Sequence, residues 1–322
     1  MKFFFLYYIF LSREKAANKY TVFGRVTPEQ KALLIKTIKS EGNTVAMTGD
    51  GVNDAPSIKS ADIGVGMGIT GTDVTKNVAD MVLADDNFAT IVSAVGEGRR
   101  IYDNIRKAIQ FLLGSNLSEV VSIFFATIMN FTILRAPHLL FINLVTDCFP
   151  ALALGLEKPE ENIMRRKPRS KNDGVFAGGL GFDCAYQGII VSVLTVIAFY
   201  IGEYLETGHL VLRNIADSGE GMTMAFFTMA MCEIFHSFNM RSQRGSAVAM
   251  VFKGHHNVAL YGAMIGSFLL TTAVVEIDFL ANMFEFTKLS FTEYAISLGL
   301  AFLIIPIVEI VKAIQRLTAK ND

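Results

Sequence analysis

The sequence predicts an α/β unit followed by an α-helical bundle that crosses a membrane six times. Hydrophobic residues make up 52% of the 322 residues, and the mean hydropathy of +0.41 is high for a soluble protein. From Lys107 onward several apolar segments reach roughly 20 residues, the length at which a helix spans a bilayer core. Before Lys107, short apolar strands alternate with helical segments, which predicts a parallel sheet covered on both faces.

Charge and cysteine content exclude other classes of protein. The formal net charge of -1 gives no indication of a nucleic-acid partner. Cys148, Cys184 and Cys232 all lie in apolar segments and are too scattered for a disulfide framework or a metal cluster. We expect them to be packing residues.

Residues 1–19 form an atypical leader. Its apolar run, which starts after Lys2, is short, and no small-residue cleavage site follows, which disfavours a secretory signal peptide without removing that alternative. We interpret the segment as the start of a chain that begins partway through a larger protein.

The predicted unit at residues 20–106 is organised around Thr48-Gly-Asp-Gly-Val-Asn-Asp-Ala-Pro56. This stretch follows a short apolar strand, Thr44–Met47, and therefore places Asp50 and Asp54 at the carboxyl edge of the sheet, where α/β folds bind ligands. Glycines allow a sharp turn and a close approach to an anion. Carboxylates beside a phosphate are a usual way to hold Mg²⁺. The alternative is a simple turn-rich loop.

A lysine precedes this loop by one helix and one strand. Thr27 and Pro28 predict a helix start, and the helix runs through Ser40. Lys31 then lies in the first turn, where a phosphoryl group meets both the helix dipole and the ammonium. The alternative is a solvated surface lysine.

The remaining elements of the unit follow in order. We expect a helix at 55–60, a strand at 62–67, a helix and a strand within 71–83, and a turn at 85–87. The helix that starts at Phe88 continues through Arg106 into apolar sequence without a proline. It is therefore predicted to be a stalk that enters the bilayer.

Six spans are predicted near 107–133, 137–156, 177–202, 221–240, 256–280 and 291–314, within a membrane domain of residues 107–322. Basic residues follow the second and fourth spans, which predicts that those loops, the α/β unit and the C-terminus are cytoplasmic. These residues are Arg165, Arg166, Lys167, Arg169, Lys171, Arg241, Arg244 and Lys253. The opposite loops are acidic.

Polar side chains inside the first two spans are the candidate ion ligands. Asn116 and Glu119 share one helix face, and Asn143, Thr146 and Asp147 share another. Pro150 weakens its helix and frees backbone carbonyls. Carboxylate, amide, hydroxyl and carbonyl oxygens suit Ca²⁺, which takes roughly six to eight oxygen ligands. The alternative is interhelical hydrogen bonding with Glu119 protonated.

The Thr48–Pro56 stretch is similar to the second-acid motif of the haloacid-dehalogenase superfamily in the form found in P-type ATPases. With Ser115-Asn-Leu-Ser-Glu119, Asn143-Leu-Val-Thr-Asp147 and Ala151–Gly155, the chain resembles the carboxyl-terminal half of a sarcoplasmic-reticulum-type calcium-transporting P-type ATPase. The resemblance implies that residues 20–106 are the C-terminal part of a haloacid-dehalogenase-like (Rossmann-like) phosphorylation domain. It also implies that the six spans are equivalent to spans 5–10 of such a pump.

The resemblance implies a role for each candidate residue. Asp50 and Asp54 would serve Mg²⁺, Lys31 and Asn53 would assist the phosphoryl group, and the five membrane residues would bind Ca²⁺ as the transported ion. The Asp-Lys-Thr-Gly-Thr motif, the nucleotide domain and the actuator domain of such pumps do not occur in this sequence. ATP would therefore bind mainly to a missing N-terminal half, and the chain alone would be inactive. The alternative is a non-catalytic membrane protein that binds ions or a partner pump.

The resemblance also bears on stoichiometry. Two-site calcium pumps carry a further glutamate on the eighth span, and alignment through Cys232 puts Ala230 at that position. Glu233 lies three residues further, a shift of roughly 4.5 Å in depth, so we expect it not to reach the ion. The expectation is one Ca²⁺ per ATP, with Glu119 exchanging protons.

Overall fold

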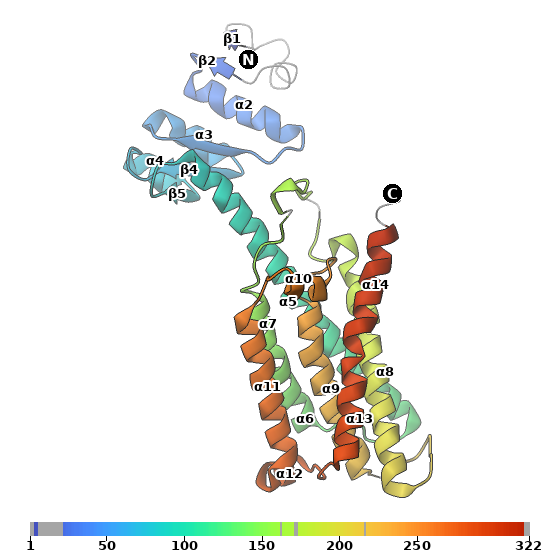
Figure 1. Ribbon diagram of the computed structural model, residues 1–322. Coiled ribbons are helices and arrows are strands. Elements are labelled where there is room, and N and C mark those ends of the chain that lie inside the picture. Colours follow the sequence, from blue (N-terminus) through green and yellow to red (C-terminus); the bar gives the residue numbers. More distant parts are fainter. Residues whose placement is uncertain (1–2, 6–21, 162, 171–172, 216, 319–322) are drawn as a thin grey trace. The chain divides into compact units, whose positions relative to one another are not determined.

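The computed structural model describes residues 3–5, 22–161, 163–170, 173–215 and 217–318. The chain divides into two compact units, Met1–Gly96 and Glu97–Asp322 (Figure 1). Most of the expected leader, and Lys171 of the basic loop, lie outside the described residues. Of the leader the structure describes strand β1 (Phe3–Phe5), which pairs in parallel with β2 (Val22–Gly24).

The first unit contains the predicted small parallel sheet. Strands β3 (Ala46–Gly49), β4 (Ile63–Met67) and β5 (Met81–Leu83) pair in the order β3-β4-β5, with Ala46 opposite Ile63 and Val65 opposite Met81. Helix α2 (Pro28–Ser40) precedes β3, η2 (Val52–Asp54) and α3 (Ala55–Ser60) connect β3 to β4, and α4 (Asp73–Val78) connects β4 to β5. Strand–helix–strand connections between parallel strands bring the loops after successive strands to one edge of the sheet.

Helix α2 begins where the sequence predicts. Thr27 Oγ1 accepts a hydrogen bond from Gln30 N at 3.3 Å, and Gln30 Oε1 accepts one from Thr27 N at 3.0 Å. This reciprocal capping box satisfies two backbone N–H donors. Pro28, at the first helical position, has no N–H that would need an acceptor. The cap therefore fixes Lys31 in the first turn.

The loop after β4 is tied to the turn after β5 by Asp86. Its carboxylate accepts hydrogen bonds from Ile69 N at 3.0 Å and from the backbone N and hydroxyl of Thr70, each at 2.7 Å. Desolvation raises the pKa of Asp86, but these hydrogen bonds outweigh it and lower the pKa from 3.8 to about 2. The ionised carboxylate therefore stabilises the folded unit.

Because the folded-state pKa is the lower one, this stabilisation is present above about pH 4 and is lost as the pH falls through about 2. We expect that Asp86→Asn removes the loss of stability that protonation of the Asp86 carboxylate causes at low pH. The test is the thermal melting temperature of both proteins between pH 5 and pH 2 in steps of about half a unit. Parallel curves for the two proteins would contradict the assignment.

The second unit is helical (Figure 1). Helix α5 (Phe88–Met129) begins in the first unit and continues into the second without a break, as predicted. The other long segments are α6 (Ala136–Phe141), η3 (Ile142–Asp147) and α7 (Cys148–Leu154) in one line, α8 (Leu180–Thr207), α9 (Gly219–Asn239), α11 (Val258–Glu276), and α13 (Phe291–Phe302) with α14 (Ile304–Thr318). Shorter pieces are η4 (Ile163–Arg165), η5 (Ala177–Gly179), α10 (Ala247–Phe252) and α12 (Asp278–Phe284).

Five segments among the described residues are long and apolar enough to cross a membrane: Phe88–Met129, Ala136–Leu154, Ala177–Thr207, Val258–Glu276 and Phe291–Thr318. The chain is therefore an integral membrane protein. The fourth predicted span, 221–240, forms α9, but this helix is not apolar enough to be counted with those five segments. Its glycine, threonine, serine, glutamate and histidine residues account for the difference.

Helix α9 lies inside the bundle rather than at its surface. It contacts α8, α11, α13 and α14, and nearly all of its side chains are buried. Glycines permit the closest of these contacts, because a Cβ on Gly202 of α8 would lie 2.7 Å from Gly221 Cα of α9. Polar residues of α9 therefore face protein rather than lipid.

The predicted second span is not one regular helix. Between α6 and α7, residues Ile142–Asp147 form a π-helical turn. Pro150 has no N–H to give to the Thr146 carbonyl, and its ring crowds that carbonyl, so the backbone widens there. The predicted weakening at Pro150 thus takes the form of a turn that holds three candidate ligands.

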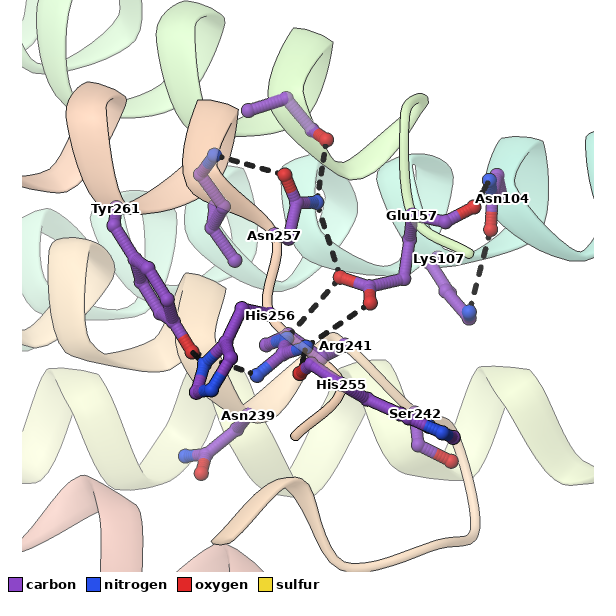
Figure 2. A network of polar contacts seen from close by, with 12 residues as sticks. Asn104, Lys107, Glu157, Asn239, Arg241, Ser242, His255, His256, Asn257 and Tyr261 are labelled. Carbon is purple, nitrogen blue, oxygen red and sulfur yellow. Dashed lines mark hydrogen bonds and ion pairs between the residues drawn. The ribbon is translucent and has the colours of Figure 1, made fainter. Parts of the chain in front are cut away.

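One end of the bundle holds a buried polar network (Figure 2). Arg241, after α9, pairs with Glu157, after α7, through Nε–Oε2 and Nη2–Oε1 contacts of 3.1 Å, and both side chains are fully buried. Arg241 Nη1 also donates to the Tyr261 hydroxyl at 3.1 Å, and Asn257 Nδ2 donates to Glu157 Oε2 at 3.0 Å. Asn104 of α5 donates to the Glu157 carbonyl at 2.8 Å. The network therefore joins α5, α7, α9 and α11.

Candidate functional site

The first candidate site lies at the carboxyl edge of the small sheet. Lys31 Nζ, in the first turn of α2, lies 2.6 Å from Asp54 Oδ1, at the end of η2. A Cβ at Gly49 would lie 2.4 Å from Asp54 Cβ, so only glycine permits this approach. The structure thus brings together two of the four predicted phosphoryl-handling residues.

The other two residues lie on the same loop. Asp50 directly follows β3 and is exposed, and its carbonyl accepts a hydrogen bond from Thr72 N at 3.0 Å, which links the loops after β3 and β4. Asn53 lies in η2 and is also exposed. Two carboxylates and an amide beside an ammonium fit a hydrated Mg²⁺ with a phosphate, since Mg²⁺ usually keeps several waters and binds one or two carboxylates.

The second candidate site is a cluster of oxygens inside the helical unit. Ser115 Oγ, on α5, lies 2.7 Å from Asp147 Oδ2 and 2.5 Å from Glu233 Oε1. Thr146 Oγ1, in η3, lies 2.9 Å from Glu233 Oε2 and 2.9 Å from the Ile142 carbonyl. Asp147 Oδ1 is buried and has no hydrogen-bond partner among the described residues. Three helices thus converge on one polar cluster.

A second pair lies beside this cluster. Asn143 Nδ2 lies 2.8 and 3.0 Å from the two oxygens of Glu119 and also donates to the Leu139 carbonyl at 2.9 Å. Glu119 is 7% exposed, so its carboxylate lies in surroundings where an uncompensated charge is costly. Two of the predicted ion ligands, Glu119 and Asn143, are therefore in direct contact.

Asn116 differs from the expectation. Its side chain is exposed, and its amide donates to the Leu112 carbonyl of its own helix at 2.7 Å. Successive helical residues are turned by about 100°, so when Ser115 faces the cluster its neighbour faces away. The structure does not bring Asn116 to the other four membrane residues.

The expectation that Glu233 lies at the wrong depth is wrong. Its carboxylate contacts Ser115 and Thr146 directly. The depth argument assumed regular helices, whereas Thr146 and Asp147 lie in a π-helical turn that packs against α9. Ala230, at the position suggested by alignment, is also buried but brings no oxygen. Sequence reasoning also missed Ser115, one residue before Asn116.

The described residues thus combine a parallel-sheet unit that carries an acidic loop with a multi-span helical bundle that holds buried carboxylates. Residues 131–314 match the family model described as "Cation transporting ATPase, C-terminus". The chain belongs to this family.

The relatives are calcium-transporting ATPases. They include calcium-transporting ATPase 1 of Bacillus cereus, 40% identical over 92% of this chain and 34% of the relative, and the calcium-transporting ATPase of Bacillus subtilis, 42% identical over 87% and 30%. The endoplasmic-reticulum-type calcium-transporting ATPase 3 of Arabidopsis thaliana is 38% identical over 94% of this chain and 32% of the relative. The chain thus spans about a third of the length of these relatives.

Proposed function

We propose that this chain is the C-terminal portion of an ATP-driven P-type pump that exports Ca²⁺ across a membrane. The observation that carries the proposal is the buried oxygen cluster at the meeting of α5, η3 and α9, with the Glu119–Asn143 pair beside it. Hard oxygen ligands with several carboxylates suit Ca²⁺. The names of the calcium-transporting relatives support the same ion.

We infer that residues 20–106 are the C-terminal part of a haloacid-dehalogenase-like phosphorylation domain with its stalk. Lys31 would neutralise a phosphoryl group, and Asn53 would donate a hydrogen bond to it. Asp50 and Asp54 would hold Mg²⁺, which supplies charge neutralisation at the phosphoryl oxygens. Lys31 also positions Asp54 through their 2.6 Å contact. ATP itself would bind mainly to the missing portion.

We also infer six membrane crossings within residues 107–322, with α9 as the fourth. Asn104 of α5, just before the first predicted crossing, and Lys312 of α14, near the end of the last, lie at the same end of the bundle. Asn104 donates to a carbonyl of the loop after α7, and Lys312 donates to the carbonyls of Asn239 and Ser242 at the end of α9, which the Arg241–Glu157 pair joins to that loop. An even number of crossings returns the chain to its starting side. The basic loops at that end support a cytoplasmic head and C-terminus.

The proposed partners are membrane lipid and the missing N-terminal half. Strand β3 is an edge of the described three-stranded sheet, and an unpaired edge is a template for another strand. We expect a strand of the missing half to pair there and to bring the phosphorylated aspartate close to Lys31 and Asp50. No nucleic-acid partner is proposed.

The test is reconstitution of the chain with the N-terminal two thirds of a calcium-transporting relative, such as that of Bacillus subtilis. We expect the assembled protein to form a hydroxylamine-sensitive acyl-phosphate from labelled ATP and to load vesicles with ⁴⁵Ca²⁺. The chain alone should do neither, because the attacking aspartate is supplied by the other half. Labelling of the chain alone would overturn this assignment. Failure of a folded complex to transport would favour a non-catalytic ion-binding or pump-partner protein.

A further inference from the structure

A cavity of about 280 Å³ lies between the loop after α7 and helix α10, and we call it the α10 cavity. Its lining includes two acids, two basic residues, a serine and a small apolar residue: Glu160, Glu161, Lys253, His255, Ser242 and Ala249. The apolar span Ala136–Leu154 ends shortly before the two acids, and the span Val258–Glu276 starts shortly after the two basic residues. The α10 cavity therefore lies at the level where the membrane surface meets water.

Contacts with buried side chains hold the walls of this cavity in place. Ser242 is buried, and its Oγ donates to Glu160 Oε1 at 2.8 Å. Glu160 Oε2 lies 2.7 Å from Arg166 Nη2, so the charge of Glu160 is already compensated. The buried Arg241 donates to the His255 carbonyl (Figure 2). The cavity is therefore a preformed part of the fold.

The other charges of the lining form a loose group. Lys253 Nζ lies 3.5 Å from Glu161 Oε2, and His255 Nε2 lies 4.0 Å from Glu161 Oε1. The side chains of Lys253 and Glu161 are both more than half exposed. Exposed pairs of this length contribute little to stability, so a ligand can replace each partner at small cost.

A zwitterion suits this loose pair. Its anionic group would contact Lys253 while its cationic group contacts Glu161, so both charges keep a partner. A simple cation or anion would separate the pair and leave one member alone. A metal ion is disfavoured, because no three acidic, histidine or cysteine side chains meet as a metal site among the described residues.

The lining also indicates the kind of cationic group. Among the described residues that line the cavity there is no phenylalanine, tyrosine or tryptophan, whose ring faces bind quaternary ammonium groups. Carboxylates and hydroxyls instead accept hydrogen bonds from N–H donors. A primary ammonium carries three such donors, and its charge strengthens each bond to a carboxylate.

We propose that the α10 cavity binds the headgroup of phosphatidylethanolamine from the adjoining leaflet, with the ammonium at Glu161 and the phosphate at Lys253. Phe252, next to Lys253, and Val258, at the start of α11, are both strongly exposed. Apolar side chains beside a charged cavity suit a lipid, because its acyl chains need apolar surroundings where the headgroup leaves water. The inference goes beyond the proposed function and does not depend on ion transport.

The test is native mass spectrometry of the chain in detergent micelles, titrated with phosphatidylethanolamine, phosphatidylcholine or phosphatidylglycerol of identical acyl chains. We expect one phosphatidylethanolamine to bind about fivefold more tightly than the other two, the ratio that one partly exposed charge pair provides. Glu161→Gln should remove this preference, because the ammonium loses its carboxylate. Asp278→Asn is the matched control: it removes an acid from the exposed Lys288–Asp278 pair beyond the far end of α11 and should keep the preference.

Filling the cavity provides a second route that changes no charge. Ala249→Phe should abolish the preferred binding, whereas Val248→Phe, at the neighbouring exposed residue outside the lining, should not. Folding of each variant is checked by circular-dichroism melting. Equal binding of the three lipids by the folded wild-type chain, or an unchanged preference in folded Glu161→Gln or Ala249→Phe, would overturn the inference.

Soluble phosphoethanolamine distinguishes a lipid from a free headgroup. It should displace the bound lipid only at concentrations about 100-fold higher or more, because it lacks the apolar part of the contact. Displacement at concentrations similar to that of the lipid would overturn the assignment to a membrane lipid. The proposed function stands or falls on the reconstitution, so neither outcome affects it.

Discussion

Asp50→Asn in the reconstituted pump is expected to lower acyl-phosphate formation by at least about 100-fold, because the loop loses a charge that holds Mg²⁺ at the phosphoryl group. Ca²⁺ affinity of the membrane cluster should change by less than about threefold, since the two sites share no side chains. The measurements are acid-stable ³²P labelling and ⁴⁵Ca²⁺ binding on one preparation.

Asp73→Asn is the matched control for this variant. Asp73 is an exposed acid in the first turn of α4, in the same unit, and should be replaceable without loss of labelling. A parallel loss of labelling and Ca²⁺ binding in Asp50→Asn would mean that Asp50 maintains the fold instead.

Arg241→Met is expected to lower the free energy of unfolding by about 3–5 kcal/mol, because it leaves Glu157 as a buried charge without its partner. The double variant Arg241→Met with Glu157→Leu should recover much of this loss, since no isolated charge remains. The chain has no tryptophan, so unfolding is followed by circular dichroism or a cysteine-reactive dye.

An exposed ion pair with a similar N–O distance serves as the control for this prediction. Lys288 Nζ lies 2.7 Å from Asp278 Oδ1, and both side chains are more than half exposed. Lys288→Met should destabilise the protein much less than Arg241→Met does, because solvent screens exposed pairs. Equal losses at Lys288 and Arg241, or a double variant as unstable as the single one, would contradict a charge-burial origin.

Local signals predicted most of the first unit. Thr27, Pro28 and Gln30 determine the start of α2 through contacts within four residues, and α2 and α3 have the predicted bounds. The parallel pairing of β3, β4 and β5 follows from the alternation of strands and helices. Such features depend on neighbours in sequence, which is why a single sequence is sufficient for them.

The membrane cluster was predictable only in part. Helical spacing identified Glu119, Asn143, Thr146 and Asp147, but it could not place α9 against η3. Pro150 was a visible signal of irregular backbone, whereas the resulting π-helical turn depends on packing against other helices. The same limit applies to Asn116, whose direction is set by the rotation of α5, and to the Arg241–Glu157 pair, which joins residues far apart in sequence.

The burial of α9 has a consequence for how the protein is made. A helix with two glutamates, a histidine and two threonines gains little from lipid alone, so a membrane insertion machinery would not readily release it as an independent segment. The close approach of Gly202 and Gly221 gives α9 a partner in the preceding helix. Helices α8 and α9 therefore suit insertion as one hairpin. The polar residues that α9 brings into the bundle are thus those that make its biosynthesis depend on its neighbours.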